Sequence, residues 1–341
     1  MERVEDSEMY SAITILMSIA SKVNPTELPA CIELLLADMD RTFPEHLALH
    51  AVTELFNFVP VGPFRLPVVK ALCQLGATHP DCTKTVATMI ATKSIKWARV
   101  WELPPREAGM LHLAVAEVAH AAMPVQSNPA QVLALYTAGL LALDRDWSAV
   151  PQSVFPVVQA AIKRAIVCFL TYDVYECDFL SCKVVEKMAS GTPHYTIITA
   201  MMEGNVEGVK KALKNTPALV AELNTSEEAF VLKTRHMALL ALAQKARGGA
   251  VPYTRIAEAL ALKEDEVEAM VVSAIRRGLL EASMDQVRAE VTFSKYTFRV
   301  FGTENWTEIA AKLREFQASL AVVPAAIDRA AKMSVSDLRN P

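Results

Sequence analysis

Residues 254–279 read TRIAEALALKEDEVEAMVVSAIRRGL, and this stretch decides the fold of the last third of the chain. Its pattern predicts one helix over residues 254–260, a short turn, and a second helix over residues 265–279. Asp265 and Glu268 have the spacing of a capping box at the start of the second helix. The apolar side chains of that helix share one face: Val267, Met270, Val271, Ala274 and Ile275.

Two short alternating segments follow the second helix and predict a β-hairpin. Apolar side chains alternate along residues 280–284 and again along residues 289–293, and the polar residues 285–288 separate the two segments. Two helices followed by a hairpin are typical of a winged helix, which is a recognition module. We expect Val291 and Phe293 to mark the structural edge of the hairpin, and we name both as candidate interface residues.

The charge of this module argues against DNA as its ligand. Helix-turn-helix proteins place the start of the second helix against DNA and surround it with basic side chains. Here that position carries a run of acidic residues, and residues 250–300 contain seven basic and eight acidic side chains. We therefore predict recognition of a protein. One alternative is that the wing only caps its own domain and binds no partner. A second alternative, from another functional class, is a winged-helix protein that binds nucleic acid.

Composition predicts a helical protein with a large core. The chain has 341 residues, of which 52% are hydrophobic and 21% charged, with a net charge of −4. Up to about residue 200, apolar helical stretches alternate roughly every 20 residues with breaks that contain Pro or Asn. This alternation is typical of stacked antiparallel helix pairs, although no named repeat consensus is present.

We therefore predict a mainly α protein with three parts. A helical-repeat solenoid covers residues 1–204, and a core that includes the winged helix (about residues 250–300) covers residues 205–300. A C-terminal amphipathic helix and tail cover residues 301–341. Within the core, residues 226–247 predict its longest helix, and Arg235 on that helix is a candidate buried or interface charge.

The terminal helix is the second unusual feature of the chain. Asn305 and Glu308 predict its start, and Pro324 is expected to bend or break it. Its apolar side chains repeat as in a heptad seam: Trp306, Ile309, Leu313, Phe316, Leu320, Val323 and Ile327. The first five of these are candidate interface residues. The seam predicts docking into a helical bundle, and packing back onto its own domain fits the pattern equally well.

The sequence contains few residues that could catalyse a reaction or bind a metal ion. His46, His50 and Glu54 lie one helical turn apart and could bind a metal ion, but no HExxH order or distant third ligand accompanies them. We favour an ordinary amphipathic helix, with a metalloenzyme built on the two histidines as the rival. The sequence contains no phosphate-binding loop, dinucleotide fingerprint or nucleophile elbow. We predict a protein that is not an enzyme and needs no cofactor or metal.

The sequence also predicts a cytoplasmic location. The N-terminus, MERVEDSE, is acidic and lacks the basic region of a signal peptide. The longest uncharged apolar run, residues 132–143, is too short to cross a bilayer. The six cysteines match no disulfide framework and predict buried, reduced thiols. No membrane partner is expected.

Several stretches resemble the PCI domain, the scaffold module shared by the proteasome lid, the COP9 signalosome and eukaryotic translation initiation factor 3. Residues 203–213 are similar to the short helix before the PCI core, residues 230–246 to its long helix, and residues 253–293 to its winged helix. The ending SKYTFRVFGTENW at residues 294–306, followed by a helix with LREFQASL, is similar to that of an initiation factor 3 subunit.

The resemblance implies a non-catalytic scaffold subunit of translation initiation factor 3. Such a subunit would support assembly of the PCI/MPN core and its binding to the small ribosomal subunit during translation initiation. Its partners would be other PCI and MPN subunits, reached through the winged-helix edge and a C-terminal helical bundle. The small ribosomal subunit would be reached through the complex, with no direct DNA contact. Subunit 7 of the COP9 signalosome is the alternative.

Overall fold

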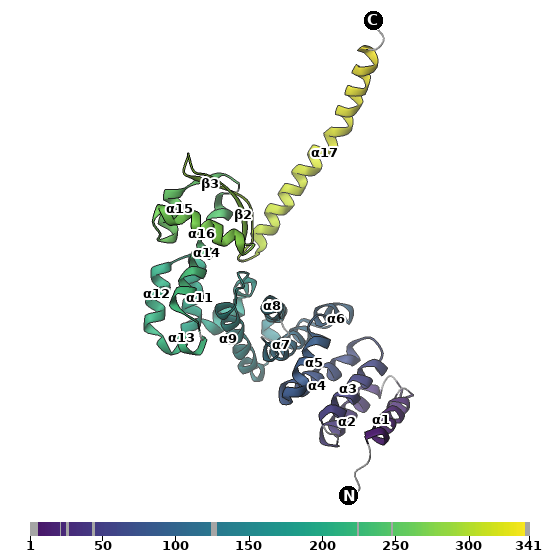
Figure 1. The fold of residues 1–341 in the computed structure, drawn as a ribbon. Coiled ribbons are helices and arrows are strands. Elements are labelled where there is room, and N and C mark those ends of the chain that lie inside the picture. Colours follow the sequence, from purple (N-terminus) through teal and green to yellow (C-terminus); the bar gives the residue numbers. More distant parts are fainter. Residues whose placement is uncertain are drawn as a thin grey trace. The chain divides into compact units, whose positions relative to one another are not determined.

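Short helices separated by turns follow one another along the first part of the chain (Figure 1). The computed structural model describes residues 6–20, 22–24, 27–42, 45–123, 128–223, 225–246 and 248–337. Its helices up to residue 203 are α1 Asp6–Ala20, α2 Leu28–Thr42, α3 Glu45–Phe58, α4 Leu66–Thr78, α5 Pro80–Ile90, α6 Ser94–Val100, α7 Pro105–Ala121, α8 Pro129–Asp144, α9 Phe155–Thr171, α10 Lys183–Ala189 and α11 Pro193–Glu203. The 3-10 turns are η1 Pro63–Arg65, η2 Trp147–Ala149, η3 Gln152–Val154 and η4 Asp178–Ser181.

Helices of this region pack against helices one to three positions away in sequence order, as a helical-repeat solenoid requires. Proline occupies the first turn of α4, α5, α7, α8, α9 and α11, where its missing N–H costs no hydrogen bond. The predicted mainly α fold with helical repeats is confirmed. The boundary that we predict at residue 204 stays a prediction.

Two glycines allow α7 and α8 to approach each other closely in the repeat region. A Cβ atom added to Gly109 would lie 2.6 Å from Cγ of Leu143, and one added to Gly139 would lie 2.7 Å from Cδ2 of Leu113. Leu113 and Leu143 are both buried. Each glycine therefore makes room for a leucine of the facing helix.

Three helices lead from the repeat into the last part of the first unit: α12 Val206–Asn215, α13 Pro217–Leu223 and α14 Glu227–Ala246. The Asn205 side chain caps α12 by accepting a hydrogen bond from the Gly208 N–H at 2.8 Å. Ser226 caps α14 by accepting one from the Ala229 N–H at 3.2 Å. The predicted long helix is thus present and ends at Ala246; residue 247, its predicted last residue, lies outside the described part of the chain.

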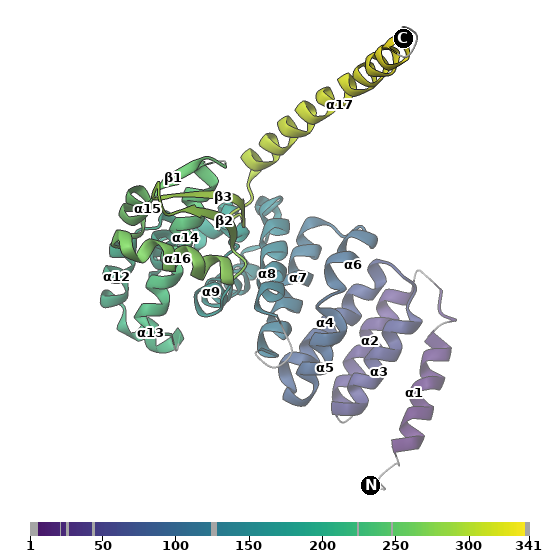
Figure 2. The ribbon, with the colours of Figure 1, turned by 45° about the horizontal axis from the view of Figure 1, so that its top comes forward.

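A small winged helix follows α14. It consists of β1 Ala250–Pro252, α15 Tyr253–Leu260, α16 Glu264–Arg276, β2 Leu280–Asp285 and β3 Glu290–Tyr296. The sheet is antiparallel with the order β1-β3-β2 (Figure 2). Its register pairs Met284 with Val291 and Ala282 with Phe293, and a bulge separates Glu281 from Ala282. The predicted winged helix is confirmed, with its second helix starting one residue earlier and ending three residues sooner.

The second unit, Val300–Pro341, contains α17, which runs from Thr303 to Asp337 as one helix (Figure 1). It begins two residues before the predicted start at Asn305. We expected Pro324 to bend or break the helix; it lies inside the helix, so the break does not occur, and the bend stays a prediction. The alanine-rich residues around this proline favour helix strongly enough to tolerate the loss of one backbone hydrogen bond.

Within the described residues, one stretch is long and apolar enough by composition to cross a membrane, Gln152–Thr171. It coincides largely with α9. That helix buries Val158, Ile162, Ile166 and Phe169, and it packs against α8, α10 and α11. Such burial is typical of a core helix.

The glycines between α7 and α8 give a first testable prediction. Gly109→Ala should lower the free energy of unfolding by about 1–2 kcal/mol, because crowding against Leu143 costs more than the gain in helix propensity returns. Urea unfolding followed by circular dichroism measures the change. The same substitution should cost clearly less in a Leu143→Ala background, where the clashing side chain is shorter. Equal or higher stability of Gly109→Ala would contradict the close approach.

Candidate protein-interaction site

The start of α16 is exposed and acidic. Glu264, Asp265 and Glu266 occupy its first turn, where negative charge complements the positive end of the helix. The side chain of Glu266 accepts a hydrogen bond from the Lys263 backbone N–H at 3.1 Å. The predicted capping box of Asp265 and Glu268 is therefore wrong, because the helix starts earlier and shifts the capping positions by two residues.

Glu268 instead connects α16 to α15 and to the tip of the hairpin. One of its carboxylate oxygens accepts a hydrogen bond from the Tyr253 hydroxyl at 3.1 Å, and the other accepts one from Gln286 at 3.0 Å. These bonds fix α15 and the tip of the hairpin against α16. The carboxylate thus holds the wing in place.

The hairpin residues that we named lie inside the module. Val291 and Phe293 on β3 are 0% and 1% exposed. Because β3 is the central strand, the two outer strands of the sheet are β1 and β2. In the described part of the chain, one long side of β2 has no neighbouring strand. Val291 and Phe293 therefore support the wing from within. Both outer strands have one side without a neighbouring strand among the described residues, and β2 is the longer of the two. Their role at an interface stays a prediction.

Arg235 is half-buried and holds two elements of the core together. It donates hydrogen bonds from Nε to the carbonyl of Leu260 and from a terminal guanidinium nitrogen to the carbonyl of Ala261, both at 3.2 Å. Ala261 ends α15 in the left-handed conformation, with a φ of 49°. The last carbonyls of a helix have no partner within the helix, and Arg235 donates hydrogen bonds to two of them. Arg235 thus fastens α15 to α14, and its contact with a partner protein stays a prediction.

The seam of α17 is the largest exposed apolar feature among the candidates. Trp306, Leu313 and Phe316 are 62–63% exposed and Leu320 is 51% exposed, whereas Ile309 is half-buried. Val323 and Ile327 continue the same stripe and are also exposed. Trp306 meets the ring of Phe301 edge to face, with ring centres 5.0 Å apart. The structure therefore places five candidate residues on α17, two (Val291 and Phe293) on β3 of the winged helix, and Arg235 on α14 before it.

A buried lysine that was not among the predicted interface residues connects α14 with the end of α9. Lys233 is 6% exposed and donates hydrogen bonds to the carbonyls of Phe169 and Tyr172, the latter at 2.7 Å. Its ammonium also lies 4.0 Å from the centre of the Phe169 ring. Burial lowers the pKa of Lys233 to about 8. The cation satisfies carbonyls at the C-terminus of α9 that have no helical partner.

A buried histidine makes a second connection from α14. His236 is 0% exposed; Nδ1 lies 3.1 Å from the hydroxyl of Tyr175, and Nε2 lies 3.2 Å from the hydroxyl of Ser273 on α16. Burial, with a smaller contribution from Arg277, lowers the pKa of His236 to about 4. One neutral imidazole therefore links the segment after α9 to the winged helix.

Arg299 closes the same region from the end of the winged unit. Its guanidinium donates to the carbonyl of Met202, and its own carbonyl accepts from the Cys177 N–H at 2.7 Å. Together with Lys233 and His236, it binds the winged helix to the last helices of the repeat. The sequence carried one signal for this network: charged and polar side chains interrupt α14, a helix that is otherwise apolar on most sides.

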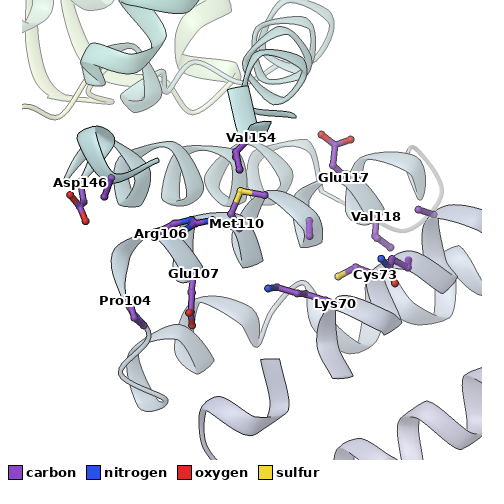
Figure 3. A pocket seen from close by; sticks show the side chains of 14 residues that line it. Lys70, Cys73, Pro104, Arg106, Glu107, Met110, Glu117, Val118, Asp146 and Val154 are labelled. Carbon is purple, nitrogen blue, oxygen red and sulfur yellow. The ribbon is translucent and has the colours of Figure 1, made fainter. Parts of the chain in front are cut away.

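A cleft in the first unit contains one thiol, which is not activated as a nucleophile. It has a volume of about 830 Å³ and lies beside α4 and α7 (Figure 3). Lys70 extends into it from α4, and Arg106 and Met110 line it from α7 (Figure 3). Burial raises the pKa of its one thiol, Cys73, to about 12, so this thiol stays protonated and is a poor nucleophile.

The structure offers little support for a metal site. Within the described residues no group of three or more His, Cys, Asp or Glu side chains could hold a metal ion. His50 is half-buried and packs edge to face on Tyr10, with ring centres 4.7 Å apart. The side chain of His46 lies outside the described part of the chain. All six cysteines are free thiols.

The buried His236 gives a prediction for the dependence of stability on pH. The unfolded chain takes up a proton on this residue near pH 6.5, whereas the folded chain resists it until about pH 4. The stabilisation is therefore complete above pH 6.5 and is lost as the pH falls toward 4. His236→Gln keeps hydrogen-bonding groups but cannot titrate. Between pH 7 and pH 4.5, wild type should lose about 2 kcal/mol more unfolding free energy than this variant, measured in urea. Parallel curves would contradict the assignment.

Comparison with known proteins identifies the module. Residues 211–295 match the model of the PCI domain. The chain is similar to proteins named eukaryotic translation initiation factor 3 subunit M: it is 27% identical to that of Coccidioides immitis over 81% of this chain, and 27% identical to that of Aspergillus fumigatus over 93%. It is 28% identical to that of Emericella nidulans over 82% of this chain. It spans 60%, 69% and 62% of the length of these three relatives.

Proposed function

We propose that this chain, which contains a PCI domain and resembles subunit M of eukaryotic translation initiation factor 3, is a non-catalytic scaffold subunit of that factor. It would act in the cytoplasm, support assembly of the PCI/MPN core, and help to hold the complex on the small ribosomal subunit during initiation. The observation that carries the proposal is the exposed heptad seam of α17, because such a seam needs partner helices.

The energetics of the seam favour a partner. Full burial of one large apolar side chain stabilises a complex by roughly 1.5–3 kcal/mol. Trp306, Leu313, Phe316 and Leu320 would together contribute on the order of 6–12 kcal/mol, from which the entropy cost of association must be subtracted. The second unit contains one helix and no further element of secondary structure among its described residues, so it cannot bury the seam within itself.

The winged helix supports the proposal through β2 and through its charge. A strand with one side unpaired can be extended by a strand of another protein, with backbone hydrogen bonds providing the affinity. The acidic start of α16 would repel phosphates and therefore favours a protein over a nucleic acid. These features fit a module that lines up with similar modules in a complex.

The rigid connections around α14 support a structural role. Lys233, His236 and Arg299 each form hydrogen bonds with other parts of the first unit. A scaffold must hold its repeat and its winged helix in a fixed relation, and buried polar contacts of defined geometry serve that purpose.

A double substitution in the seam tests the proposal. Leu313→Asp with Phe316→Asp should release the tagged protein from the other initiation factor subunits and lower their recovery at least tenfold. Aspartates in the middle of a helical bundle would have to be buried without partners. Affinity purification from cells followed by quantitative mass spectrometry measures the recovery.

A matched control carries the same charge on the opposite face of α17. Ala311→Asp with Ala318→Asp places two aspartates at exposed positions of the same helix and should leave recovery unchanged. Far-UV circular dichroism checks that both variants keep wild-type helix content. Full recovery of partners with the seam variant would show that the seam is not the docking surface. If the wild-type chain brings down COP9 signalosome subunits instead, the scaffold role holds in a different complex.

The charge of the winged helix gives a separate prediction about nucleic acid. The full-length chain should show no binding to a 20-base-pair DNA duplex with a dissociation constant below about 1 μM at 0.15 M salt. Fluorescence anisotropy with the labelled duplex measures this. Tight binding that weakens steeply with rising salt would favour the nucleic-acid-binding alternative.

A further inference from the structure

A cluster of aromatic side chains joins α6 to the end of α3. Trp97 and Trp101 stack with ring centres 5.3 Å apart, and Phe56 lies 5.2 Å from Trp97. The guanidinium of Arg65 lies 4.5 Å from the centre of the Phe56 ring, and its Nε donates to the carbonyl of Val59 at 2.9 Å. The short helix α6 is therefore anchored by its inward face, and its outward face is held in a defined orientation.

The outward face of α6 carries apolar and basic side chains together. Ile95 and Val100 are 42% and 65% exposed. Lys93, Lys96 and Arg99 are also exposed, and no ion pair in the described part of the chain involves any of the three. At helical spacing these five residues form one continuous side of the helix, opposite the buried Ser94 and Trp101. We call these five residues the α6 face.

We propose that the α6 face binds an acidic amphipathic segment of a partner protein. Charge complementarity carries the proposal: residues 91–103 contain three basic side chains and a single acidic one, Glu102. Ile95 and Val100 lie among the cations and would receive apolar side chains of the same segment. The surface lies on the repeat, far along the chain from the seam of α17, and it does not depend on the proposed docking of that helix.

The arrangement of the rings favours a protein over an RNA. Base stacking requires an open aromatic face. Trp97 is stacked on Trp101 and is also packed against Phe56, and Arg65 lies over Phe56, so these rings are already engaged within the chain. The exposed apolar side chains of the α6 face, Ile95 and Val100, are aliphatic, and aliphatic groups pack against apolar side chains and offer no stacking surface to a base.

The size of the face indicates a short and salt-sensitive contact. Two aliphatic anchors and three exposed cations match one or two turns of an amphipathic helix. Contacts between exposed charges are screened within about 10 Å at 0.1 M salt. The cations would therefore chiefly set the on-rate and the choice of partner, while the apolar anchors limit dissociation.

Site-specific photo-crosslinking in cells tests the proposal with the full-length chain. Benzoylphenylalanine is introduced at Val100, and at Val157, an exposed valine of α9, as the control position. Crosslinked peptides are sequenced by mass spectrometry. The expected result is a crosslink from position 100, and not from position 157, to a protein segment that is net acidic and carries apolar residues at helical spacing.

Charge reversal then distinguishes complementarity from accidental proximity. Lys96→Glu with Arg99→Glu should reduce the crosslink from position 100 at least tenfold. Both changes lie at exposed positions, so circular dichroism and co-purification of partners through α17 should stay at wild-type level. The proposal is overturned by a crosslink to RNA, by a crosslink to a neutral or basic segment, by one that survives charge reversal, or by no crosslink above the control position. None of these outcomes changes the test of the seam.

Discussion

The burial of α14 is the constraint on which the rest of the first unit depends. This helix contacts α11 and α12 of the preceding region and α15, α16 and β3 of the winged helix. A helix covered on so many sides must pair every polar group that it carries. Lys233 donates hydrogen bonds to the carbonyls of Phe169 and Tyr172 at the end of α9. His236 forms hydrogen bonds with the hydroxyls of Tyr175 and Ser273. The same contacts that satisfy α14 thereby make the repeat and the winged helix parts of one unit.

The sequence predicted those elements whose periodicity is strong. The two helices and the hairpin of residues 250–300 were predictable because their apolar residues repeat at clear helical and strand spacings, and the seam of α17 was predictable for the same reason. The capping box at Asp265 was misplaced because several acidic residues at the start of α16 can act as caps, and their sequence alone does not select among them. The alternative of a break at Pro324 was wrong because a single proline does not end a helix whose neighbours favour it.

The polar network was beyond the reach of sequence patterns. Lys233 and Phe169 are 64 residues apart, and His236 and Tyr175 are 61 apart, so nothing local shows that they meet. The position of β3 in the centre of the sheet has a similar cause, since the short strand β1 before α15 gives no alternating pattern of its own. Consequently Val291 and Phe293 proved to be core residues, and the strands with a free side are β1 and the longer β2.

The central claim is that this chain is a structural subunit of the initiation factor, and sedimentation tests it most directly. The tagged wild-type protein is followed across a sucrose gradient of cell extract, and the proteins that purify with it from each fraction are identified by mass spectrometry. The account predicts co-migration with small ribosomal subunits together with the other subunits of initiation factor 3. Sedimentation away from ribosomes, as a free chain or with an unrelated complex, would contradict it.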